Sequence, residues 1–175
     1  MTIGVVVGMV ALSPLARGGS AVSREALASQ TAIASVVRAT ESSQVLFGEK
    51  AAAIAAVRTM AAECADVGWD GEEARGISPV ALAHAVDFLR ALPASLPLPE
   101  YAPEPDGSVS FEWAVSRHQR FMVSIGERAR LAYAWVDGTD RGHAVARFDG
   151  FNIPDRILQG LEALLIHERT AVRTA

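Results

Sequence analysis

The stretch that decides the fold spans residues 106–148 and reads DGSVSFEWAVSRHQRFMVSIGERARLAYAWVDGTDRGHAVARF. Three of its segments place large apolar residues at every second position, with small or polar residues between them. These apolar sets are Val109, Phe111, Trp113 and Val115, then Phe121, Val123 and Ile125, then Leu131, Tyr133 and Trp135. A period of two puts alternate side chains on opposite faces of a strand. The pattern predicts antiparallel strands with one buried face, ending in an edge strand at HAVARF.

Helix signals lie on both sides of this stretch. Apolar residues three and four apart, with dense alanine, predict a helix over about residues 48–66 that carries Cys64 on its apolar stripe. Ser78 followed by Pro79 is typical of a helix start and predicts a second helix over about 78–92. In that helix His84 lies off the apolar stripe, which favours a solvated side chain.

The strongest apolar stripe follows Pro154 and predicts a C-terminal helix over about residues 153–168. We therefore predict an α+β fold, in which an antiparallel sheet of three or four strands over about 108–148 packs against this helix and the two earlier ones. Between the second helix and the sheet, residues 93–105 read PASLPLPEYAPEP, and five prolines predict an extended, polyproline-like connector.

The N-terminal segment over residues 2–16 carries no charge. It is too short for a transmembrane helix, which needs about 20 apolar residues, and it lacks the basic residues that precede the apolar core of a secretory signal. A strand or a leader that does not pack on the domain are the other interpretations. We predict a loosely attached apolar and helical extension over 1–45, a single domain over 46–170 and a cytoplasmic protein, with export as the alternative.

Composition limits the function classes. The net charge of −4 over 175 residues gives no basic surface for nucleic acid, so we expect no nucleic-acid partner. Lys50 is the only lysine, an arginine bias that indicates a GC-rich bacterial genome. Cys64 is the only cysteine, which excludes an internal disulfide and a cysteine-based zinc site within one chain. No phosphate loop or hydrolase motif is present, so we expect no cofactor, and the oligomeric state stays open.

Several of these segments together resemble a known pattern. GWDGEEARGIS, the proline-rich connector, PEPDGSVSFEW and LAYAWVDGTDR are similar to a family of small uncharacterised bacterial proteins, over about residues 46–165. The resemblance implies a domain boundary near residue 45 and assigns no catalytic residue. It slightly favours a role in binding a partner protein.

Asp137, Asp140 and His143 form the polar group that most resembles a catalytic site. Two carboxylates and an imidazole within seven residues are able to hold a divalent metal or to act as acid and base, with Glu112 as a further candidate. The alternative is that Asp-Gly and Asp-Arg-Gly are ordinary hairpin residues. Glu112 points away from the buried face and is predicted to be solvated or paired with an arginine of a neighbouring strand such as Arg120.

Trp69 and Asp70 form the second candidate site, because glycines flank them in the loop Gly68-Trp69-Asp70-Gly71. A tryptophan in such a turn either plugs the edge of a core or presents a binding surface, and we favour the plug. Our preferred hypothesis is a non-enzymatic module that binds an unidentified protein through this loop or through the edge strand, with Trp69, Asp70, His143 and Arg147 as contacts. The alternative is a metal-dependent hydrolase or nuclease that uses Asp137, Asp140 and His143.

Overall fold

The structure, a computed structural model, describes residues 47–172, with side chains described as far as residue 166. These residues belong to one compact unit. The predictions for residues 1–45, including the apolar segment, lie outside the described residues. Within the described part, no helix has the length and apolar character that crossing a membrane requires.

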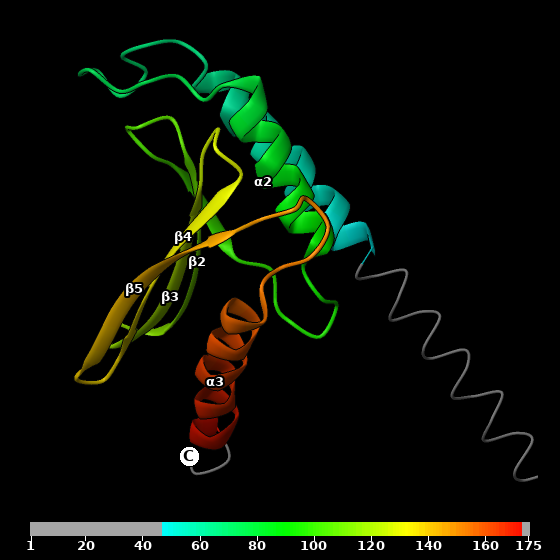
Figure 1. The fold of residues 1–175 in the computed structure, drawn as a ribbon, viewed down its shortest axis with the longest axis vertical. Coiled ribbons are helices and arrows are strands. Elements are labelled where there is room, and N and C mark those ends of the chain that lie inside the picture. Colours follow the sequence, from blue (N-terminus) through cyan, green and yellow to red (C-terminus); the bar gives the residue numbers. More distant parts are fainter. Residues whose placement is uncertain (1–46, 173–175) are drawn as a thin grey trace, which may run out of the picture. The chain divides into compact units, whose positions relative to one another are not determined.

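Five antiparallel strands form one sheet in which neighbours in sequence are neighbours in space (Figure 1). The strands are β1 (Glu100–Pro103), β2 (Val109–Ser116), β3 (Gln119–Ile125), β4 (Arg130–Asp137) and β5 (Asp140–Arg147). This meander leaves β1 at one edge of the sheet and β5 at the other. The α+β class and the antiparallel sheet are confirmed, and so is the edge position of the HAVARF strand.

The register explains the alternation in the sequence. Phe111 lies opposite Val123, which lies opposite Tyr133, and all three side chains are buried on one face. Neighbours along each strand point to the other face, where Glu112 is half-buried and Met122 is exposed. We call these the core face and the outer face of the sheet.

Two helices before the sheet form an antiparallel hairpin. The first spans residues 47–63 and the second is α2 (Pro79–Ala91). At one end of the hairpin the Lys50 ammonium donates to the Leu92 carbonyl at 2.6 Å, and at the other Ile77 N–H donates to the Cys64 carbonyl at 2.8 Å. The predicted start of α2 is confirmed, since the Ser78 side chain accepts from the Ala81 N–H.

Two helices, α2 and α3, pack on the sheet (Figure 1). α2 contacts β2 and β3, and its Phe88 ring packs against Phe111, Trp113 and Phe148. The C-terminal helix α3 (Asp155–Val172) contacts β2, β3 and β4, with Gly160 against the Phe121 ring. Among the described elements, neither α2 nor α3 contacts β5.

Two details of the prediction are wrong. The sheet has five strands rather than three or four, because residues 100–103 of the proline-rich connector pair with β2 as β1. Prolines at 99, 103 and 105 argued against a strand in the sequence. An edge strand nevertheless tolerates proline, because it needs a backbone N–H donor only where it faces its neighbouring strand. His84 is half-buried rather than solvated, and its Nδ1 lies 3.0 Å from the Gly126 carbonyl in the β3–β4 turn.

Candidate functional site

β5, a strand of eight residues, is the longer of the two edge strands of the described sheet. Its core-face residues Gly142, Ala144 and Ala146 are half-buried, whereas its outer-face residues are exposed. An edge strand presents unpaired backbone N–H and C=O groups along its length. β5 is therefore the longest stretch of backbone in the described sheet that offers pairing to another chain.

A cavity of about 480 Å³ lies between this edge and α3. Trp135 and Ala144 line it from the sheet, and Arg156, Gln159 and Ala163 line it from the helix. It exists because α3 crosses β2, β3 and β4 and stops short of the fifth strand. Ligand pockets in proteins commonly measure about 300–1,000 Å³, so the cavity has room for one or two side chains of a partner.

The floor of the cavity is a ladder of aromatic rings. Phe121 stacks on Tyr133 with ring centroids 5.9 Å apart, and Tyr133 stacks on Trp135 at 6.2 Å. Two glycines make room for these rings, because a Cβ at Gly142 would overlap the Trp135 indole and a Cβ at Gly160 would overlap the Phe121 ring. The alternation in the sequence predicted that these aromatic side chains are buried in the core, but Trp135 is only half-buried and faces the cavity.

Asp137, Asp140 and His143 all line this same cavity. Asp137 lies opposite Asp140 where the β4–β5 hairpin closes, and the Asp137 carboxylate accepts a hydrogen bond from the Gln119 amide at 3.1 Å. His143 pairs with Ala134 on the outer face, so the cavity extends around the edge of β5. Within residues 47–166, no three His, Cys, Asp or Glu side chains are grouped closely enough to hold a metal ion.

The loop that carries Trp69 and Asp70 is tied to the domain by its own side chains. The Trp69 indole is half-buried against the core and its Nε1–H donates to the Arg75 carbonyl at 3.0 Å. The Asp70 carboxylate accepts from the Glu72 and Ala74 backbone N–H groups. Gly68 and Gly71 have φ of 79° and 85°, which allows this tight turn. The geometry fits the plug interpretation of Trp69.

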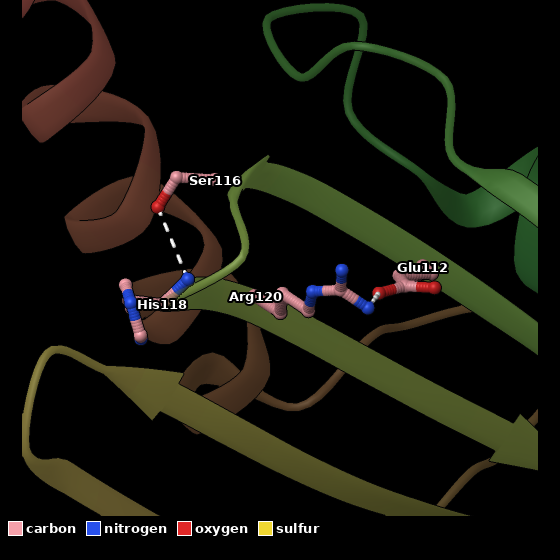
Figure 2. A network of polar contacts seen from close by, with 4 residues as sticks. All are labelled: Glu112, Ser116, His118 and Arg120. Carbon is pink, nitrogen blue, oxygen red and sulfur yellow. Dashed lines mark hydrogen bonds and ion pairs between the residues drawn. The ribbon is translucent and has the colours of Figure 1, made fainter.

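Glu112 lies apart from the cavity, on the outer face of β2. Its carboxylate pairs with the Arg120 guanidinium at 3.1 Å, as the alternation predicts (Figure 2). The same view shows the turn between β2 and β3, where the Ser116 hydroxyl accepts from the His118 backbone N–H at 3.2 Å. Glu112 is thus occupied by an ion pair and does not join Asp137, Asp140 and His143.

Arg147, the other predicted contact residue, ends β5 on the outer face. It lies directly opposite Arg130 of β4, and both side chains are exposed. Sequence reasoning missed Arg130, because only the register of the β4–β5 hairpin brings residues 130 and 147 together. The alternation of Arg141, His143, Val145 and Arg147 with glycine and alanine is the sequence signal for an outer face of this kind.

Lys50 lies beside a second cavity, of about 240 Å³, at the end of α2. Its ammonium donates to the Leu92 and Arg90 carbonyls, and burial lowers the pKa of this amine from its ordinary value. Carbonyls at a helix C-terminus lack partners within the helix and favour a cation. We conclude that Lys50 stabilises the end of α2.

Comparison with protein-family models, with curated proteins and with solved structures finds no match to this chain.

Proposed function

We propose that this protein is a non-enzymatic interaction module that binds an extended segment of a partner protein as an added strand on β5. The observation that carries the proposal is the free eight-residue edge of β5 beside the cavity under α3. Strand addition joins backbone hydrogen bonds, which supply affinity, to pockets for alternate side chains, which supply specificity. β5 and the cavity offer both.

The backbone of β5 suits this role better than the backbone of β1. In an antiparallel pair the N–H and C=O groups of successive residues turn alternately toward one neighbour and the other. An edge strand of eight residues therefore offers about four residues to a partner. β1 has four residues and ends in Pro103, which has no N–H.

The side chains of an added strand would alternate as those of β5 do. On the core face they would lie beside Gly142, Ala144 and Ala146, whose small side chains leave the cavity open. There an apolar side chain would contact the Trp135 ring and α3. Full burial of one such side chain contributes about 1.5–3 kcal/mol, enough for two of them to raise the affinity of a short peptide by orders of magnitude.

Selection of peptides from a random library displayed on phage, against the immobilised protein, tests the proposal. We expect peptides with apolar residues at alternate positions. In a selected peptide, N-methylation of every second backbone nitrogen should abolish binding when the methylated N–H groups face β5. Methylation of the other alternate set should leave binding intact, because those N–H groups point away from β5.

Two α3 variants provide a matched comparison, since Gln159 lines the cavity and Glu162 does not, and both are exposed. Gln159→Trp should fill the cavity and weaken peptide binding about tenfold or more, whereas Glu162→Trp should change it less than about twofold. Failure to recover any binding peptide, or equal effects of both variants on its affinity, would contradict the proposal.

A second candidate function is a metal-dependent hydrolase or nuclease. The observation in its favour is that Asp137, Asp140 and His143 line one cavity, although in the described structure they are not grouped closely enough to hold a metal ion. Acid–base or metal chemistry needs such groups within about 3 Å of the reacting atom or the ion. Calorimetric titration with magnesium, manganese and zinc tests it, because a site of this kind should give heat of binding that Asp137→Asn removes. No heat with any of the three metals would end this candidate.

A further inference from the structure

The outer face at the free edge of the sheet carries an excess of positive charge. Its positions on β4 and β5 hold three arginines, a histidine and otherwise only small or apolar residues. They are Arg130, Ala132, Ala134 and Val136 on β4, and Arg141, His143, Val145 and Arg147 on β5. None of these residues is acidic, although the whole chain has a net charge of −4.

The pairing of Arg130 with Arg147 concentrates this charge. The two residues are directly opposite across β4 and β5, where Cβ atoms of paired residues lie about 4.5–5.5 Å apart. Like charges in such a pair destabilise a sheet. Among the described residues neither guanidinium is in an ion pair, so no salt bridge in this part of the chain offsets the repulsion.

Another arginine of the same face is neutralised. Arg120 of β3 pairs with Glu112 of β2 at 3.1 Å (Figure 2). The unneutralised charge therefore lies toward the edge that the proposed partner strand would join. Arginine is the side chain best suited to this contact, because its planar guanidinium binds a carboxylate through two parallel hydrogen bonds.

We infer that the segment bound by β5 is acidic, with carboxylate side chains opposite Arg141 and Arg147; this inference rests on the proposed strand addition. Residues directly opposite in paired strands share a face. Arg141 and Arg147 are six residues apart, so the two acidic residues of the segment are six apart as well, or about 20 Å. Between them, the residue opposite Val145 is apolar, and the alternate positions face the cavity.

The β5 strand of a second copy of this chain brings no carboxylate opposite Arg141 or Arg147. Two-fold axes at His143 and at Ala144 pair equally long stretches of β5 with itself: the first sets Arg141 opposite Val145, and the second sets Arg141 of each copy opposite Arg147 of the other. In the second arrangement two further like-charge pairs would add to the repulsion between Arg130 and Arg147. Charge complementarity selects a different, acidic chain.

A charge exchange tests this inference with the peptides selected on the intact protein. Arg147→Glu should weaken binding of an acidic peptide about tenfold or more, and replacing the facing acidic residue of the peptide by arginine should restore it. Arg58→Glu makes the same change of charge on an exposed helix residue away from β5, and should change the affinity less than about twofold. Binding should weaken as salt rises.

The outcomes separate this inference from the proposed function. Two results would overturn the acidic partner and leave strand addition standing. In the first, the selected peptides show the alternating N-methylation effect but contain no excess of acidic residues. In the second, Arg147→Glu weakens peptide binding no more than Arg58→Glu does. The acidic-peptide inference would also be overturned, in favour of a nucleic-acid partner, if a single-stranded DNA oligonucleotide binds as tightly as the peptide and Arg147→Glu abolishes that binding. If no peptide binds at β5, both proposals fail.

Discussion

Gly142 and Trp135 lie directly opposite each other on β5 and β4, and the indole ring fills the space that a side chain at position 142 would occupy. The glycine is thus what allows the tryptophan to lie flat over the edge strand and form the floor of the cavity. An interior glycine weakens a strand because it loses more backbone entropy on folding than other residues do and has no side chain to pack. Here the aromatic ring covers the gap.

Gly142→Ala should therefore destabilise the protein, because the added methyl group overlaps the six-membered ring of Trp135. Insertion of a methyl group into a packed site costs about 1–3 kcal/mol. Urea unfolding measures the loss, and the indole N–H signal of Trp135 in an NMR spectrum should shift. Unchanged stability with an unmoved indole signal would show that the ring does not occupy this space.

Gly160 inside α3 and Gly48 at the first described turn of the first helix provide a comparison. Alanine favours a helix interior over glycine by about 1 kcal/mol, so propensity alone predicts that both replacements stabilise. A Cβ at Gly48 meets nothing within 4 Å, whereas a Cβ at Gly160 overlaps the Phe121 ring. We expect Gly48→Ala to raise the free energy of unfolding by up to about 1 kcal/mol and Gly160→Ala to lower it. The same sign for both variants would contradict the packing of α3 on Phe121.

Asp149 should make stability depend on pH below 4. Hydrogen bonds from the Asn152 amide, the Asn152 N–H and the Phe151 N–H lower the pKa of its carboxyl from 3.8 to about 2. Since the folded state binds the proton more weakly than the unfolded chain, the contribution is complete above about pH 4 and is lost as the pH falls toward 2.

Unfolding of the wild type and of Asp149→Ala across this range is the measurement. The wild type should be more stable at pH 6, and the difference should shrink between pH 4 and pH 2. A difference that stays constant over that range would mean that the carboxyl is not held by these bonds.

Cys64 should react slowly with thiol reagents. Burial, and after it the nearby Glu63 carboxylate, raises the pKa of the thiol, and the thiolate is the form that reacts. Alkylation by iodoacetamide at neutral pH should be at least about tenfold slower in the folded protein than in urea. Equal rates would contradict both the burial of Cys64 and its interpretation as a structural thiol.

Local patterns in the sequence were sufficient for most elements of the fold. Alternation predicted β2, β3 and β4, and the Ser78–Pro79 signature predicted the start of α2. The ion pair of Glu112 with Arg120 was also predictable, because it follows from alternation on adjacent strands. In each case the deciding interaction involves residues close in sequence, so that a short window contains its cause.

The missed features depend on long-range geometry. β1 is a strand because Tyr101 lies opposite Phe111, and nothing within the proline-rich stretch itself indicates that pairing. The cavity depends on where α3 stops across the sheet, and the pairing of Arg130 with Arg147 depends on the register of a hairpin. Asp137, Asp140 and His143 were grouped by their proximity in the sequence, but the cavity that all three line could not be foreseen.

The central claim is that β5 receives the partner strand. Hydrogen exchange of backbone amides, with and without a saturating selected peptide, tests it most directly, because a new ladder protects the outward-facing amides of the edge strand. We predict slowed exchange at alternate residues of β5, with the loop over residues 68–76 unchanged. Protection of that loop around Trp69, with β5 exchanging as in the free protein, would contradict the account.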